Sequence, residues 1–140
     1  MAEHEETEDG ILILDGRECR RLLAPGGVGC LGLPGDGAPI LRPVNFALHD
    51  EALVVRTGEG PILDAARRGD AAAFETDGID RLEHTGWSVL VTGRIAELPT
   101  DEATLALPLR AWASGSRDRF VSIRLEQVSG RRIPPGRGNR

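Results

Sequence analysis

The chain has 140 residues, a length that suits one domain with its own hydrophobic core. Its net charge of −5 argues against general nucleic-acid binding. No apolar run approaches the ~20 residues that span a bilayer, and the acidic N-terminus lacks the apolar stretch of a signal peptide. We therefore expect a cytoplasmic protein with no membrane and no nucleic-acid partner.

The residues that most often carry catalysis or bind metals show no functional arrangement. Cys19 and Cys30 stand in apolar surroundings without CxxC spacing, which predicts two free thiols in a reducing compartment. His49 and His84 have no partner at metal-ligand spacing. No nucleophile elbow of a Ser-His-Asp enzyme is present. The sequence therefore predicts no metal site and no catalytic side chain.

In chain order, an acidic tail and lead-in at 1–14 come first and are expected to be disordered. Asp15, with Glu18 three residues on, is typical of a capped helix start, and a short amphipathic helix is predicted over Gly16–Ala24. The predicted strands are Val28–Leu33, Pro39–Leu48, Ala52–Thr57, Asp70–Asp77, Trp87–Leu98 and Phe120–Glu126.

The remaining segments connect or follow these strands. A helix is predicted over Pro61–Arg68, a polar loop over Gly78–Thr85, and a short helix from Pro99 to about Leu107. Pro108–Arg117 is predicted to be irregular. Arg131–Arg140, with two prolines and two glycines, is predicted to be a tail. The folded domain is placed at 15–133, and 134–140 is expected to be disordered.

Six short strands with few helices predict a mainly β fold, an antiparallel barrel or sandwich rather than a βαβ fold. Closure of the sheet would remove edges that invite aggregation. The uneven strands favour a small, partly split six-stranded barrel.

The stretch Ile40–Gly69 organises the rest of the chain. It predicts a β-hairpin, a glycine turn at Gly58-Glu59-Gly60, and a helix that begins with Pro61. A glycine turn that opens a helix exposes backbone N–H groups, and the helix dipole adds partial positive charge. Arg56 would add a fork of donors. The sequence therefore predicts that the far end of the hairpin can hold a phosphate.

A series of short motifs resembles a known family. In order they read RPVNF, VVRTGEG, LDAARRG, AAFETD, TGWSVLVTGR, LPLRAWA and RDRFVSIRLEQVSGRRI. Together they are similar to the pyridoxamine 5′-phosphate oxidase-like family of flavin-binding split β-barrels, in particular to small actinobacterial members. The resemblance covers roughly residues 15 to 133.

The resemblance implies a homodimer with a flavin in each of two grooves between the protomers. Arg56 and Thr57 match the family's phosphate-binding positions, followed by Gly58 and Gly60 in the turn. The segment Pro43, Val44 and Asn45 matches the one that runs along the flavin ring. Gly86–Val89, with Trp87 and Ser88, matches a segment that lines the groove or the dimer contact.

One departure concerns the phosphate. The family usually carries a Lys where this chain has Ile62, and Glu59 adds a negative charge nearby. Losing one charged hydrogen bond costs roughly 1.5–3 kcal/mol, or about one to two decades in affinity.

Several alternatives stay open for single residues. Arg56 equally suits a salt bridge, and Asn45 a bulge or turn. Trp87 suits the core or the dimer contact, and Trp112 suits either a cap on the barrel or a lid over the groove.

The resemblance favours an FMN-binding protein, a flavin-dependent oxidoreductase that acts on an unknown small molecule. One alternative is a reductase that uses the deazaflavin F420. The other is a dimeric binding or regulatory module that has lost flavin affinity and holds no cofactor.

Overall fold

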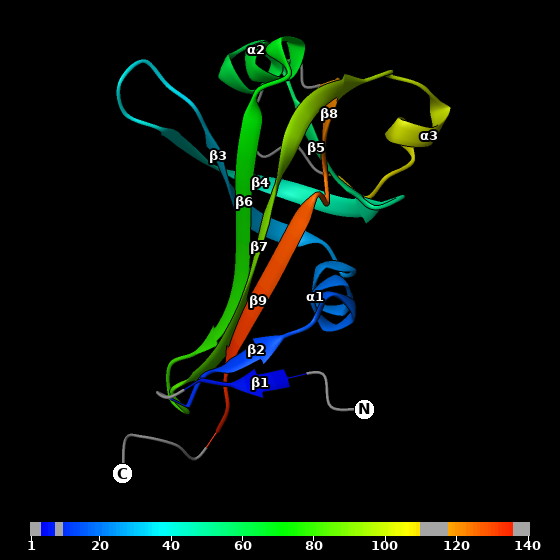
Figure 1. Cartoon of the computed structure of the whole chain (residues 1–140). Helices are drawn as coiled ribbons and strands as arrows, with labels where there is room; N and C mark the ends of the chain where they lie inside the picture. The colour runs from blue at the N-terminus through cyan, green and yellow to red at the C-terminus, as the bar shows by residue number, and fades with distance from the viewer. Residues whose placement is uncertain (1–3, 8–9, 110–117, 136–140) are drawn as a thin grey trace.

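The computed structural model describes residues 4–7, 10–109 and 118–135. Within these ranges antiparallel strands dominate and the helices are short (Figure 1). The elements are β1 (His4–Glu6), β2 (Leu12–Leu14), α1 (Gly16–Leu23), β3 (Gly27–Leu33), β4 (Ile40–His49), β5 (Ala52–Thr57), α2 (Pro61–Arg68), β6 (Ala71–Asp80), β7 (Thr85–Leu98), α3 (Glu102–Leu105), β8 (Arg119–Arg124) and β9 (Gln127–Ile133).

Strands β3 to β8 close into a six-stranded antiparallel barrel. They lie side by side in the order β7-β6-β3-β4-β5-β8, and β8 pairs back onto β7. These six strands correspond to the six predicted from the sequence, so the expected fold class is confirmed. The predicted bounds of β5 and α2 match the observed ones.

One edge of β7 serves two neighbours in turn. Residues Gly86–Thr92 pair with β9, and Ile95–Leu98 pair with β8. Gly93 lies at the change-over, where a Cβ would stand 2.2 Å from the carbonyl oxygen of Arg124. Only glycine allows the end of β8 to approach the β7 backbone this closely.

The sheet contains more strands than the six predicted, at both ends of the chain. Arg131–Ile133, predicted as the start of a tail, belongs to β9, which pairs with β7. In the predicted acidic tail, β1 pairs with β2 and β2 pairs with β9, so strands occupy part of residues 1–14. Residues 136–140 of the predicted C-terminal tail lie outside the described residues.

Two predicted connections are also shorter than expected. The loop predicted over Gly78–Thr85 is wrong at both ends, because β6 runs to Asp80 and β7 begins at Thr85. The helix predicted to reach Leu107 ends at Leu105. Of the segment predicted to be irregular, residues 110–117, including Trp112, lie outside the described residues.

The main core fills the barrel and continues beneath α1. Phe74 and Phe46 meet at its centre with a ring-centroid distance of 4.8 Å and an interplanar angle of 67°, an edge-to-face pair. Cys19 of α1 is fully buried and faces Gly130 of β9. A second, smaller cluster (Ala47, Val54, Leu109 and Phe120) lies on the other side of β5 and β8.

The helices cover distinct parts of the barrel. Helix α1 begins where the Asp15 carboxylate accepts the backbone N–H of Glu18 at 2.8 Å, which confirms the predicted cap. Helix α2 packs against β7 and β8 at the top of the view in Figure 1. Helix α3 stands at the right side of the molecule in Figure 1, and the segment after it adds Leu107 and Leu109 to the second cluster. None of the described helices is long and apolar enough to cross a membrane.

Candidate functional site

The predicted phosphate site lies where β5 passes into α2. Gly60 precedes the helix with φ of 145°, a conformation that favours glycine, and Pro61 takes the first helical position. No side chain caps this end of α2, so its first-turn N–H groups and the positive end of the helix dipole are left for another acceptor. The local backbone is therefore the anion-accepting arrangement that the glycine turn predicts.

The side chains of Arg56 and Thr57 leave opposite faces of β5. The Arg56 guanidinium carbon lies 5.4 Å from the ring centre of Phe120, in the second cluster. Thr57 is 4 % exposed and lies directly opposite Arg119 in register. Because opposite residues of an antiparallel pair share a face, Thr57 and Arg119 belong together. Of the two predicted phosphate residues, only Thr57 therefore points to the Arg119 side.

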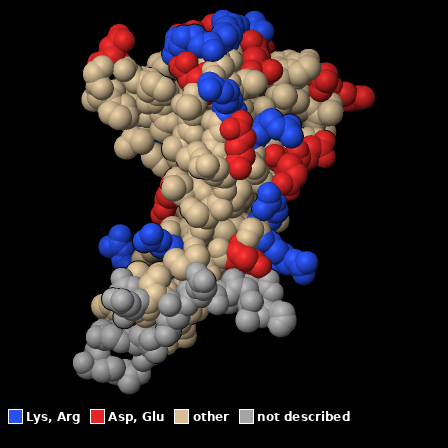
Figure 2. Space-filling model, viewed as in Figure 1, with Lys and Arg blue, Asp and Glu red and all other residues tan. Residues whose placement is uncertain are grey.

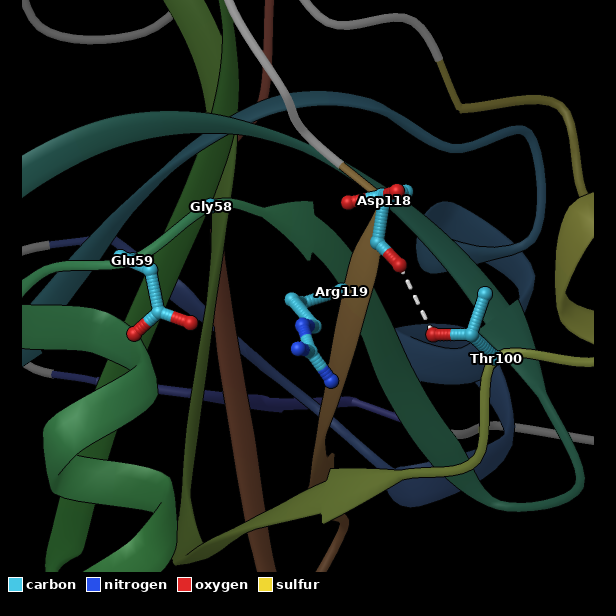
Figure 3. Close-up of a pocket in the computed structure, with 5 residues that line it drawn as sticks. All are labelled: Gly58, Glu59, Thr100, Asp118 and Arg119. Carbon is cyan, nitrogen blue, oxygen red and sulfur yellow. Dashed lines mark hydrogen bonds between the residues drawn. The ribbon is translucent and has the colours of Figure 1, made fainter.

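A pocket of about 320 Å³ opens at this end of β5 (Figure 3). We call it the β5-end pocket, and it is lined by Gly58, Glu59, Thr100, Asp118 and Arg119. The Thr100 hydroxyl donates to the backbone carbonyl of Asp118 at 2.7 Å and ties the start of β8 to the end of β7. In Figure 3 the Arg119 side chain projects between Glu59 and Thr100. The sequence alone did not identify Arg119, because its position beside the pocket depends on how β5 pairs with β8.

Ion pairs balance the acidic residues at the pocket. The Arg67 guanidinium lies 3.5 Å from a carboxylate oxygen of Glu59 and 3.3 Å from one of Glu97. Arg119 reaches Glu97 only at 3.8 Å. Exposed pairs of this length contribute little to stability, so an incoming anion can replace Glu97 as the partner of Arg119 at small cost. Glu59, the residue expected to repel a phosphate, forms an ion pair with Arg67.

Ile62, which stands where the family usually has Lys, packs against the main core as a partly buried side chain. The packing gives this position a structural role in the described chain. Arg119 approaches the same turn from β8 instead and is the cation of the β5-end pocket.

The other predicted site residues lie elsewhere on the barrel. On β4, Val44 packs against the core, whereas Pro43 and Asn45 point to the opposite side. On β7, Trp87 packs against the core and over Gly78, whereas Ser88 points outward. The core contact of Trp87 agrees with the alternative left open in the sequence analysis.

Pro43, Asn45 and Ser88 point to the same outward side of the sheet, which we call the outer face. Figure 2 shows charged side chains gathered over α2 and largely uncharged surface over the middle of the sheet. The outer face comprises Val28, Cys30, Pro43, Asn45, Glu75, Asp77, Ser88 and Leu90, placed by strand register and alternation.

The β5-end pocket and Ser88 are far apart in one chain. Thr57 lies opposite Arg119, and the neighbouring Phe120 lies opposite Leu98, the last residue of β7. Ser88 lies ten residues before Leu98, or about 33 Å along an extended strand. One protomer therefore does not bring all predicted site residues together.

No group of His, Cys, Asp or Glu in the described ranges is arranged to hold a metal ion. His49 lies at the end of β4, 3.3 Å from the carboxylate of Asp50, and His84 lies exposed in the β6–β7 turn. Both described cysteines are free, and burial raises the pKa of the Cys19 thiol.

Known proteins resemble this chain over most of its length. The family model described as pyridoxamine 5′-phosphate oxidase matches residues 15–132. The uncharacterized protein Rv0080 of Mycobacterium tuberculosis is 34% identical over 130 residues, covering 88% of this chain and 86% of that protein.

Two solved structures share the fold and part of the sequence. The FAD-binding protein from Mycobacterium smegmatis is 30% identical, covers 89% of this chain and all (100%) of its own, and superposes with a TM-score of 0.68. An FAD-binding protein from Mesorhizobium loti is 26% identical, covers 89% and 99% of the two chains, and gives a TM-score of 0.75.

Proposed function

Because this chain belongs to the pyridoxamine 5′-phosphate oxidase family, we propose that it binds a flavin nucleotide with the phosphate in the β5-end pocket. The observation that carries the proposal is the donor set at that pocket. It combines the Arg119 guanidinium of the lining with the uncapped start of α2, which follows Gly58 and Glu59 of the lining. Guanidinium and backbone N–H groups are donors of the kind that bind phosphate. The buried Thr57 lies opposite Arg119, and its hydroxyl donates to the Gly58 carbonyl at 3.4 Å.

Arg119 supplies the cation that Ile62 does not. It lies directly opposite Thr57, and its long contact with Glu97 leaves its donors available to a ligand. Arg67 keeps the charge of Glu59 balanced while the phosphate is bound. The phosphate site is therefore rebuilt from β8 rather than lost.

We further propose that the protein works as a homodimer. The predicted ring contacts Pro43, Asn45 and Ser88 belong to the outer face. Ser88 lies about 33 Å along strand β7 from the β5-end pocket. A second copy that brings its outer face to the pocket of the first would complete a groove with both parts. Size-exclusion chromatography with light scattering tests this point, and a monomer in the presence of bound flavin would contradict it.

FMN and FAD are both candidates for the cofactor. The sequence motifs favour FMN, whereas the solved relatives at 30% and 26% identity are described as FAD-binding. Both carry phosphate next to the ribityl chain, so the donor set above serves either.

The proposed activity is that of an oxidoreductase acting on a small organic molecule. A bound flavin would supply the hydride-transfer chemistry. The chain would orient the flavin through Thr57, Arg119 and the start of α2, and the apolar part of the outer face would exclude water. No side chain of this chain is proposed as the acid or base of the reaction.

F420 and the absence of any cofactor stand as alternatives. F420 also carries phosphate and would use the same donors. A non-enzymatic binding module is suggested by Ile62 in place of Lys. Ile62→Lys discriminates: a large gain in FMN affinity would indicate a degraded phosphate site in the native chain, whereas no gain fits a site that Arg119 already serves.

The test is a titration of the purified full chain with FMN, FAD and F420, followed by flavin fluorescence and thermal unfolding. A ligand at a hundredfold excess over its Kd adds about 2.7 kcal/mol to the free energy of unfolding. Arg119→Gln should weaken binding by about one to two decades, because a charged hydrogen bond contributes roughly 1.5–3 kcal/mol. Arg81→Gln, an exposed position in the β6–β7 turn, is the matched control. Absence of binding by all three ligands would overturn the proposal.

A further inference from the structure

A second cavity, of about 520 Å³, opens beside the start of α2. It lies between this helix and the turn that joins β3 to β4, both in the upper part of Figure 1, and we call it the α2-side cavity. Its volume falls within the roughly 300–1,000 Å³ of ligand pockets. None of the site residues predicted from the sequence lines it. The lining consists of Pro34, Gly35, Asp36, Ile40, Pro61, Asp64, Arg68 and Asp70.

The α2-side cavity adjoins the proposed phosphate site at Gly60. Glu59 lines the β5-end pocket and Pro61 lines the α2-side cavity, so at most about 7 Å of chain separates the two linings. A Cβ at Gly60 would meet no atom within 4 Å beyond its chain neighbours, so the space beside this residue is open. The uncapped N–H groups of α2 follow directly. A ligand held there by its phosphate can therefore extend from one pocket into the other.

The lining of the α2-side cavity combines carboxylates with apolar surface. Asp70 is already paired, because the Arg68 guanidinium donates to one of its oxygens at 2.9 and 3.0 Å. The carboxylates of Asp36 and Asp64 are exposed, and neither forms an ion pair or accepts a hydrogen bond from another described residue. The half-buried Ile40 adds apolar surface. The cavity therefore suits an uncharged group that carries hydrogen-bond donors.

The charges around the β5-end pocket favour a phosphate with a single negative charge. Arg67 and Arg119 contact the carboxylates of Glu59 and Glu97, so positive and negative groups balance at this end. A phosphate monoester, as in FMN, carries about −1.5 to −2 charges at pH 7. Each phosphate of the pyrophosphate in FAD carries a single charge. The balance therefore suits the dinucleotide better than the mononucleotide.

Adenosine has the chemistry that the α2-side cavity accepts. It is uncharged, and its ribose hydroxyls and adenine amine are donors that carboxylates accept, as an Asp or Glu does for ribose in dinucleotide-binding folds. The planar guanidinium of Arg68 can stack on the adenine ring. F420 instead carries glutamate carboxylates beyond its phosphate, which the negative lining repels. FMN ends at its phosphate and leaves the cavity unfilled.

We propose that the α2-side cavity holds the adenosine of FAD, and that FAD is the flavin this chain binds. The inference rests on the proposed function, because the pyrophosphate must lie at the β5-end pocket for the adenosine to reach past Gly60. Asp64 in the first turn of α2 and Asp36 in the β3–β4 turn accept hydrogen bonds from the adenosine. The two elements therefore hold it from two sides.

The test is the ratio of the affinities for FAD and FMN, measured by isothermal titration calorimetry on the full chain. The wild-type chain should bind FAD at least about tenfold more tightly than FMN. Asp64→Ala and Asp36→Ala each remove one acceptor and should each lower the ratio roughly three- to tenfold. Because Asp36 lies in an exposed turn, its variant tests the cavity without altering α2.

The ratio separates this role from a general electrostatic effect. Asp64 lies near the backbone donors at the start of α2, so loss of its charge alone would change both affinities by the same factor. Only an acceptor that touches the adenosine weakens FAD relative to FMN. Glu83→Ala removes an exposed carboxylate from the β6–β7 turn and is the matched control, with both affinities unchanged.

The outcomes distinguish this inference from the proposed function. Equal affinities for FAD and FMN in the wild-type chain would overturn the inference and leave the flavin site standing. A ratio that neither cavity variant changes would do the same, because the adenosine would then lie elsewhere. Absence of binding by either flavin would overturn the proposed function and this inference together.

Discussion

The close contact between Gly29 and Phe74 gives a sharp test of how the barrel is packed. Gly29 lies in β3 opposite Val44 of β4, the neighbouring strand, which carries the predicted ring contacts Pro43 and Asn45. A Cβ at Gly29 would stand 2.2 Å from one ring carbon of Phe74 and 2.8 Å from the carbonyl oxygen of Glu75. Gly29→Ala therefore forces the ring or the β6 backbone to move.

The magnitude follows from how tightly the ring is held. Phe74 is fully buried and packs edge-on against Phe46 at 4.8 Å, so no free space receives it. Inserting a methyl group into such a core costs typically about 1–3 kcal/mol. At roughly 2–4 °C per kcal/mol for a chain of this size, the melting temperature should fall by about 2–12 °C.

Gly32→Ala is the matched control in the same strand. Its Cβ would meet the Leu41 side chain at 3.4 Å and other atoms beyond that, which is ordinary contact. It should be neutral or stabilising by up to about 1 kcal/mol, because alanine has fewer unfolded conformations. Urea unfolding of both variants provides the comparison. Equal stability of Gly29→Ala and the wild-type chain would refute the packing argument.

Two further predictions concern titratable groups. A thiol reagent at neutral pH should label Cys30, which is half-buried, and leave Cys19 unlabelled until the protein unfolds, because Cys19 is fully buried and burial raises its pKa; equal rates in the native protein would contradict this. Since burial raises the pKa of Glu75 to about 7, the folded chain holds a proton that the unfolded chain releases, and the contribution of this group to stability is full below pH 4.5 and declines as pH rises to about 7. Denaturant unfolding across that range should show the decline in the wild-type chain and a smaller one in Glu75→Gln.

The sequence predicts the barrel strands because they are short apolar runs bounded by turn residues, and in β8 apolar and polar residues also alternate. Strand β9 lacks this signal for a physical reason. Its inward positions include Gly130, where a Cβ would stand 2.7 Å from the Cys19 sulfur, so a side chain of α1 fills the space instead. The end of β6 is concealed similarly, because Gly78 lies beneath the indole of Trp87.

The site is only partly predictable for a related reason. The glycine turn and Pro61 follow from local rules, so the start of α2 is found in the sequence. Arg119 enters through the pairing of β5 with β8, a register between strands that are distant in the chain. The opposite orientations of Arg56 and Thr57 follow from strand alternation, but which face of β5 meets the pocket depends on the same pairing.

The most direct test of the flavin site is a crystal structure of the chain with bound FMN or FAD. The predicted result is a phosphate within hydrogen-bonding distance of the Thr57 hydroxyl and the Arg119 guanidinium, with the flavin ring against the outer face of a second protomer. A flavin whose phosphate lies away from the end of β5, or whose ring contacts a single protomer, would contradict the account.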